Sequence, residues 1–166
     1  KNIKLIEVPS EIGAGTRGAS LGVDAIKIAA LDFMSNFFVH FPSEKIEVAN
    51  QLLFEPINSP YAKRIHGVVD IYHKLSKVVS ETIKNNFLPV ILSGDHSTAG
   101  GTITGIKIAK PKSKLGVIWI DAHADLRDSY QGSRYSHACA MRRIVDHAPC
   151  TQVAIRSLCK EESQAI

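Results

Sequence analysis

The segment that decides the fold is Leu115-Gly-Val-Ile-Trp-Ile-Asp-Ala-His-Ala-Asp125. Its first six residues are almost unbroken apolar sequence, rich in β-branched side chains, which is typical of a strand buried on both faces. The strand runs directly into Asp121, His123 and Asp125. Because alternate side chains of an extended chain share a face, these three groups are expected to point into one pocket. Polar residues also commonly end a strand without binding anything, so this segment alone leaves a metal site and a plain strand end open.

A second apolar segment ends in the same kind of residues. Residues 88–93 predict another buried strand, which runs into Asp95 and His96. Ligands of open parallel sheets bind in the crevice outside the carboxyl ends of the strands, so both strands are expected to deliver their polar groups to one edge. Asp95 is not expected to be a ligand: it either orients an imidazole or caps the helix that starts near Ser97.

Strands and helices are expected to alternate along the rest of the chain. The apolar periodicity predicts strands at 3–8, 44–53 and 150–155, helices at 21–34, 61–86, 98–110 and 137–146, and a turn at 56–60. This order is typical of a three-layer α/β/α fold with a mostly parallel sheet and helices on both faces. No composition shift or repeat divides the 166 residues, so we expect a single domain over 1–166.

Composition and charge argue against several classes of protein. The formal net charge is +4, but the basic residues are scattered, and the densest group, from Lys107 to Lys114, contains no aromatic residue on which bases could stack, so nucleic-acid binding is not expected. No apolar run approaches the roughly 18 residues of a membrane span, and a cytoplasmic protein without membrane contact is expected. The three cysteines form no Cys-x-x-Cys pair, which favours reduced thiols.

A glycine-rich segment offers a competing interpretation. Gly13-Ala-Gly-Thr-Arg-Gly18 matches the Gly-x-Gly-x-x-Gly pattern of dinucleotide sites. Four residues separate it from the end of the first strand at Val8, and the acidic residue expected about twenty positions later, Asp32, falls inside a predicted helix. A flexible turn before Leu21 explains the glycines equally well.

The polar segments together resemble a known family. Ser93-Gly-Asp-His-Ser97, Asp121-Ala-His-Ala-Asp125 and the following His137 are similar, in order and spacing, to the ureohydrolases, which include arginase and agmatinase. Members of that family are nearly twice as long and carry a later Asp-x-Asp pair and a Glu. After Asp128 this chain has only three carboxylates, Asp146, Glu161 and Glu162, and none forms that pair. The resemblance therefore implies an arginase-like fold that is incomplete at the carboxyl end.

The resemblance also implies a metal centre. Carboxylates and imidazoles without thiolates suit Mn²⁺ better than Zn²⁺, and the family binds two manganese ions. By this likeness His96, Asp121 and Asp125 would hold one ion, His123 would hold the other, and Asp121 would bridge them. His137 would transfer a proton or contact the substrate; the alternative is an ordinary surface histidine at a helix start. The family resemblance further suggests a homo-oligomer.

The substrate implied is a small guanidine compound. Arginases usually follow their Asp-x-His-x-Asp motif with a segment containing an Asn that holds the substrate carboxylate, but residues 126–137 contain none. Residues 135–143 and 152–156 resemble agmatinases, whereas the glycine-rich segment is closer to arginase. We therefore expect hydrolysis of agmatine to putrescine and urea. Arginine remains the alternative, because Arg127 or Arg134 could capture a carboxylate, and a catalytically incomplete ureohydrolase-like fragment is a third interpretation.

Overall fold

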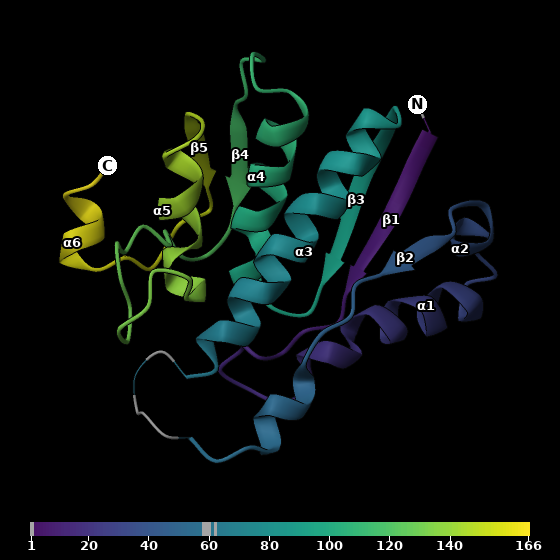
Figure 1. Ribbon diagram of the computed structural model, residues 1–166, viewed down its shortest axis with the longest axis horizontal. Coiled ribbons are helices and arrows are strands. Elements are labelled where there is room, and N and C mark those ends of the chain that lie inside the picture. Colours follow the sequence, from purple (N-terminus) through teal and green to yellow (C-terminus); the bar gives the residue numbers. More distant parts are fainter. Residues whose placement is uncertain (1, 58–60, 62) are drawn as a thin grey trace.

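The computed structural model describes residues 2–57, 61 and 63–166 (Figure 1). The strands are β1 (Asn2–Val8), β2 (Ser43–Lys45), β3 (Phe87–Ser93), β4 (Val117–Ile120) and β5 (Cys150–Val153). The α-helices are α1 (Gly22–Asp32), α2 (Phe37–His40), α3 (Ile65–Lys84), α4 (Ala99–Ala109), α5 (Ala140–Val145) and α6 (Lys160–Ser163). Short 3₁₀ helices are η1 (Ala19–Leu21), η2 (Asn50–Phe54), η3 (His96–Thr98) and η4 (His137–Cys139). This alternation of helices with parallel strands confirms the predicted α/β class.

All strand pairs that the structure describes are parallel, but they form two sheets. One has the order β2-β1-β3 and the other pairs β4 with β5. No hydrogen-bonded ladder joins β3 to β4 within the described residues. A strand pattern predicts how many strands there are but not which ones are neighbours, so the sequence alone suggested one continuous sheet.

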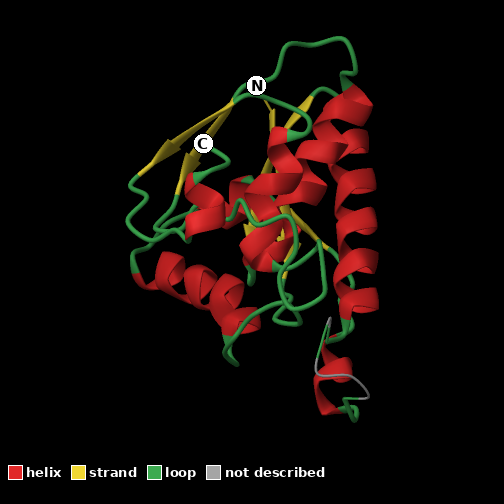
Figure 2. Cartoon of the chain, turned by 90° about the vertical axis from the view of Figure 1, so that its left-hand side faces the viewer, coloured by secondary structure: helices red, strands yellow, loops and turns green. Residues whose placement is uncertain are grey.

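The long helix α3 forms most of the core beneath β1. Its apolar residues Val68, Ile71, Leu75 and Val79 recur every three or four positions and are all buried. They belong to one cluster with the β1 side chain Ile6 and its neighbours. Helices α3 and α4 lie on one side of the strands and α1 on the other, which gives the layered arrangement seen in Figures 1 and 2.

Glycines allow α4 to pack tightly against α3. A Cβ atom at Gly101 would lie 2.8 Å from the Tyr72 carbonyl oxygen, and one at Gly105 would lie 2.6 Å from the Ser76 carbonyl oxygen. Backbone atoms cannot move aside as a flexible side chain can, so only glycine fits at these contacts. The resulting rigid pair supports the start of α4, where the site residues of η3 are located.

A second core lies under β4. Trp119 is buried with Met141 and Ile144 of α5, so α5 and the neighbouring α4 cover one face of the β4–β5 sheet. The opposite face carries Ile118 and Ile120, which are 75% and 76% exposed. The expectation of helices on both faces therefore holds around β1 and β3 but not for β4–β5 in the described part of the chain.

The largest differences from the predicted elements concern β2 and α3. The strand expected over 44–53 ends at Lys45, and its second half is the 3₁₀ helix η2. Asn50 explains the change, because its side chain accepts from the Glu11 amide (3.2 Å) and donates to the Pro9 carbonyl (2.8 Å) instead of extending β2. Helix α3 begins at Ile65 rather than 61, after Arg64 in a left-handed conformation (φ 54°). Of the turn predicted over 56–60, residues 58–60 lie outside the described residues.

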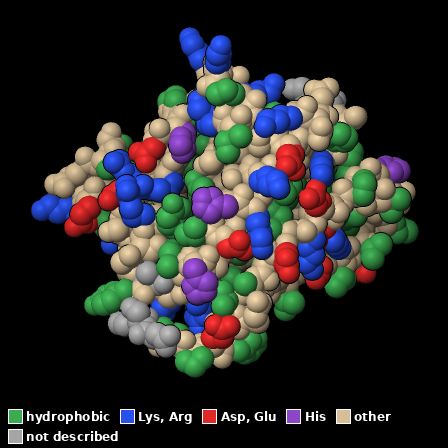
Figure 3. All heavy atoms as spheres, in the orientation of Figure 1, with side chains coloured by type: hydrophobic (Ala, Val, Ile, Leu, Met, Phe, Trp, Pro, Cys, Tyr) green, Lys and Arg blue, Asp and Glu red, His purple; other side chains and the backbone are tan. Residues whose placement is uncertain are grey.

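None of the helices in the described residues is long and apolar enough to cross a lipid bilayer. On the face of the molecule shown in Figure 3, Lys and Arg side chains are interspersed with Asp and Glu side chains.

Candidate metal and catalytic site

The ends of β3 and β4 bring three possible metal ligands together. His96 opens η3 just after β3, and Asp121 directly follows β4. The Nδ1 atom of His96 lies 3.2 Å from Oδ2 of Asp121 and 3.3 Å from Oδ2 of Asp125. One donor atom from each of these residues lies within 4.8 Å of the other two, so a single cation could contact all three. The two sheets are thus separate ladders that end at a common site.

His123 lies at the margin of this cluster. Asp121 uses its Oδ1 atom to accept a hydrogen bond from the His123 backbone N–H (2.8 Å), and His123 Nδ1 lies 3.5 Å from the same oxygen. The His123 side chain is 65% exposed. The chain bends at Ala122, and Asp125 has a left-handed backbone (φ 52°), so residues 121–125 do not form an extended strand. Asp121 and Asp125 therefore face His96 together, whereas His123 contacts only the outer side of Asp121.

Neighbouring groups hold the cluster in place. The His96 imidazole stacks on the indole of Trp119, with ring centroids 4.5 Å apart and planes at 14°. The Asp125 carbonyl accepts from the Arg142 N–H (3.0 Å), which fixes the bend to α5. Of the two roles considered for Asp95, the structure shows the helix cap: its carboxylate accepts from the N–H of Ser97 (3.0 Å) at the start of η3.

The electrostatics of the cluster favour a cation. The hydrogen bond to Asp125 raises the pKa of His96 above its ordinary value; burial acts in the opposite direction, and the charges of Asp125 and Asp121 add to the increase. Two carboxylates next to one imidazole thus stabilise positive charge at this point.

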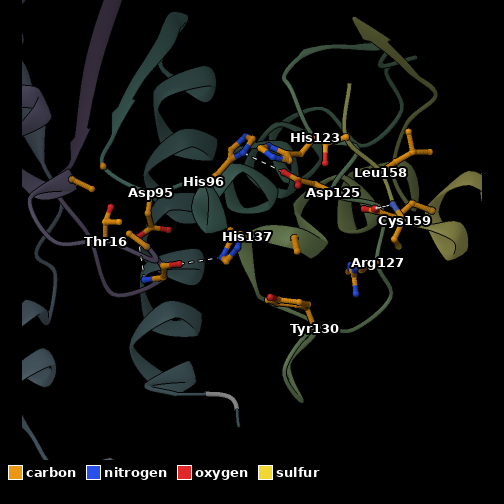
Figure 4. Close-up of a pocket in the computed structure, with 17 residues that line it drawn as sticks. Thr16, Asp95, His96, His123, Asp125, Arg127, Tyr130, His137, Leu158 and Cys159 are labelled. Atoms are coloured by element: carbon orange, nitrogen blue, oxygen red, sulfur yellow. Dashed lines mark hydrogen bonds and ion pairs between the residues drawn. The ribbon is translucent and has the colours of Figure 1, made fainter. Parts of the chain in front are cut away.

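A cavity of about 610 Å³ opens beside the cluster, as shown in Figure 4. Its wall combines residues that follow β1, β3, β4 and β5: Gly13, Ala14, Thr16, Ala19, Gly94, Asp95, His96, His123, Asp125, Arg127, Tyr130, His137, Ala138, Ser157, Leu158, Cys159 and Glu162. The sequence reasoning missed the stretch from Ser157 to Glu162. Glu162 links this stretch to the segment that follows Asp125, because the Glu162 carboxylate accepts hydrogen bonds from the N–H groups of Leu126 (3.0 Å) and Cys159 (2.8 Å).

His137 lines the same cavity as His96 and Asp125. It begins η4, and its Nδ1 atom lies 3.2 Å from the Gly13 carbonyl oxygen. The imidazole also packs edge-on against the ring of Tyr130, with centroids 5.9 Å apart. An imidazole that lines the cavity without joining the cluster is in a position to exchange protons with a bound molecule.

Comparison with known proteins identifies the family of this chain. The sequence matches the Arginase family over residues 1–166. The chain belongs to that family. It is 36% identical over 137 residues to the arginase of Brevibacillus brevis, which covers 76% of this chain and 42% of the relative. The chain spans about half the length of the curated relatives it matches.

Solved structures agree with this assignment. The arginase of Bacillus subtilis superposes with a TM-score of 0.76 at 27% identity, over 99% of this chain and 61% of that one. The agmatine ureohydrolase of Thermoplasma volcanium superposes with a TM-score of 0.73 at 24% identity, over 98% of this chain and 53% of that one, and shows the same fold.

The glycine-rich turn of this arginase-family chain does not suit a dinucleotide. The N–H groups of Gly18 and Ser20 donate to the Glu11 carboxylate, and the Gly13 N–H donates to the Asp95 carboxylate. These carboxylates occupy the donors that a pyrophosphate would need and repel its negative charge. The turn instead forms part of the cavity wall.

The two arginines considered as carboxylate ligands have different surroundings. Arg134 donates to Asp128 (3.0 Å), which also pairs with Arg143 (2.8 Å), and Arg134 does not line the cavity. Arg127 lines the cavity and lies over the ring of Tyr130, 5.2 Å from its centroid. Of these two, Arg127 is the one that a bound molecule could reach.

Proposed function

We propose that the protein to which this chain belongs is a manganese-dependent ureohydrolase that cleaves a guanidine C–N bond and releases urea. The observation that carries the proposal is that His96, Asp121 and Asp125 form one cluster, and that His96 and Asp125 of this cluster line the same cavity as His137. Membership of the arginase family supports the same chemistry.

The donor atoms suit the proposed metal. One imidazole nitrogen and two carboxylate oxygens form the cluster, which is a hard to borderline set without thiolate. His96, Asp121 and Asp125 would hold the first ion. Asp121 lies between His96 and His123, so its second oxygen, together with His123, would serve the other ion. By the family resemblance, the remaining ligands belong to an Asp-x-Asp pair that this chain does not contain.

Each part of the site has a task in guanidine hydrolysis. Two divalent cations held by these residues would lower the pKa of a shared water toward neutrality, which matters because a resonance-stabilised guanidinium is a poor electrophile. The cavity holds the guanidinium beside the carboxylates. His137 then exchanges a proton with the departing amine nitrogen, a task suited to an imidazole, whose ring nitrogens can both accept and donate a proton.

Agmatine is the substrate we propose, and arginine is the alternative. Residues 126–137 contain no Asn, and Arg134 is engaged by Asp128, so both features leave the α-carboxylate of arginine without its expected partners. Arg127 favours the alternative, because a guanidinium on the cavity wall would attract a carboxylate and repel the ammonium of agmatine.

Urea release from each compound by the manganese-loaded, full-length enzyme tests the proposal. We expect release from agmatine, and in the Arg127→Gln variant an unchanged or lower KM for it. Arg134→Gln is the matched control, because this arginine lies outside the cavity. Release from arginine alone, with an Arg127→Gln variant that raises its KM at least about tenfold, would establish the alternative substrate. Manganese binding without urea release from either compound would refute the proposed activity.

A further inference from the structure

We propose that Gly13 is a positioning residue whose backbone carbonyl fixes the tautomer of His137, and that Asp95 holds Gly13 in place. The importance of this tautomer for proton transfer rests on the proposed function, but the tautomer itself can be measured without it. The glycine-rich turn, which fits no dinucleotide, thereby acquires a task within the site.

The first observation is the hydrogen bond between the two residues. A carbonyl oxygen can only accept, so the 3.2 Å contact requires the proton of the neutral imidazole to be on Nδ1 of His137. The second nitrogen, Nε2, then keeps its lone pair. Tyr130 packs edge-on against the same ring and restricts its rotation. Figure 4 shows His137 joined to the turn in this way.

The second observation is how the turn is held. The Gly13 N–H donates to Oδ2 of Asp95 (3.3 Å), and Oδ1 of Asp95 accepts from the backbone N–H and the hydroxyl group of Ser97. The Asp95 carboxylate thus accepts hydrogen bonds from three donors, and the residue is buried. Both features restrict its movement. A series of hydrogen bonds through Asp95 and Gly13 therefore connects His137 to η3, the segment that also carries His96.

The third observation is that position 13 has no room for a side chain. A Cβ atom there would lie 2.6 Å from Oγ of Ser97 and 2.8 Å from Oδ1 of Asp95. The Ser97 hydroxyl group donates a hydrogen bond to this Asp95 oxygen, so neither atom is free to move aside. Gly15, in the same turn, has nothing within 4 Å of the equivalent position. The turn thus offers one glycine that the contact requires and another that serves as a control.

The tautomer determines which ring nitrogen of His137 exchanges protons. With Nδ1–H committed to Gly13, the neutral ring presents Nε2 as a proton acceptor, and after protonation Nε2–H becomes a donor. One nitrogen can then take up and release the same proton. The opposite tautomer would lose the Gly13 hydrogen bond and direct a lone pair at a carbonyl oxygen.

Long-range ¹H–¹⁵N NMR of the metal-free chain, at a pH where imidazoles are neutral, tests this directly. His137 is assigned by the signal lost in His137→Asn. We expect the Nδ1–H form to predominate in the wild type and in Gly15→Ala, and the Nε2–H form, which free histidine favours in water, to predominate in Gly13→Ala. Asp95→Asn, which keeps the side-chain shape but replaces the carboxylate, is expected to shift the ratio in the same direction. Thermal unfolding and circular dichroism verify that each variant is folded.

A wild-type His137 in the Nε2–H form, or a folded Gly13→Ala and Asp95→Asn that both keep the wild-type ratio, would overturn the proposal. In the full-length enzyme, Gly13→Ala is expected to lower kcat at least about tenfold and alter its pH profile, with little change in KM. A wild-type enzyme that releases no urea would refute the proposed function but leave the tautomer result intact. Urea release with an unaltered kcat pH profile in Gly13→Ala would refute the positioning role alone.

Discussion

The imidazole of His96 lies flat against the indole of Trp119, with ring planes 14° apart. Trp119 is the only tryptophan of the chain. Because His96 is also a proposed metal ligand, a cation bound at this site changes the electronic surroundings of a single fluorophore. This pair therefore provides a spectroscopic report on the site that needs no label.

Manganese binding should change the Trp119 fluorescence. We expect a saturable change on titration with Mn²⁺ in the wild type, and its loss in His96→Ala, because that variant removes both the ligand and the stacking partner. His66→Ala is the control, since His66 is exposed on α3, away from the cluster. A saturable response that persists in His96→Ala would place the ion elsewhere.

The cluster geometry predicts a ranking among the ligands. Asp125→Asn should weaken binding of the first ion at least about tenfold, because Asp125 lies 3.3 Å from His96 and is nearly buried. His123→Asn should have a much smaller effect, because the His123 side chain is exposed and lies outside the group formed by His96, Asp121 and Asp125. Isothermal titration with Mn²⁺ measures both affinities. Equal losses in the two variants would contradict the ranking.

Metal affinity should fall as the pH is lowered. The pKa of His96 is raised by Asp125, and a metal ion has to displace the proton from the imidazole, so protons compete at a higher pH than for an ordinary histidine. Below that pKa we expect the apparent affinity to decrease about tenfold per pH unit from this group alone. Titrations at a series of pH values provide the test. An affinity that does not change with pH in the acidic range would argue against His96 as a ligand.

Buried Glu7 should contribute to stability in a pH-dependent manner. Burial alone would raise its pKa, but hydrogen bonds from Lys27 and Ser43 outweigh this effect and lower the pKa. A group with a lowered pKa stabilises the folded state above the pKa of the unfolded chain, and this contribution is lost as the pH falls through the folded pKa. Glu7→Gln should therefore cost about 1–3 kcal/mol at neutral pH, since Lys27 is partly exposed.

Urea unfolding at neutral and acidic pH measures this difference, which we expect to shrink as the pH is lowered. Glu44→Gln is the matched control. Glu44 pairs with Lys4 at the surface, so its loss should change the free energy of unfolding by less than about 1 kcal/mol. A loss in the free energy of unfolding that is the same at both pH values for Glu7→Gln would contradict a lowered pKa of Glu7.

The sequence predicted the proximity of His96, Asp121 and Asp125 better than the arrangement of the sheets. His96 and Asp121 could be expected to meet because each closely follows an apolar strand segment, and the carboxyl ends of parallel strands lie at one edge. Helix α3 could be predicted because its apolar periodicity extends over several turns. Both predictions rest on patterns formed by residues that are close together in the sequence.

Features that depend on distant contacts could not be predicted in this way. Glu162 accepts from Leu126, 36 positions away, and no local pattern marks that pairing. The left-handed conformation of Asp125 was missed because non-glycine residues seldom adopt it. The segment also bends at Ala122, so the alternation expected for an extended chain, which would put His123 on the face shared by Asp121 and Asp125, does not hold.

The most direct measurement is anomalous scattering at the manganese edge from crystals of the protein grown with Mn²⁺. We expect a peak in contact with Nδ1 of His96 and with the carboxylates of Asp121 and Asp125. A peak at another place, or none at this cluster when the crystals contain manganese, would contradict the metal site on which the proposed hydrolysis depends.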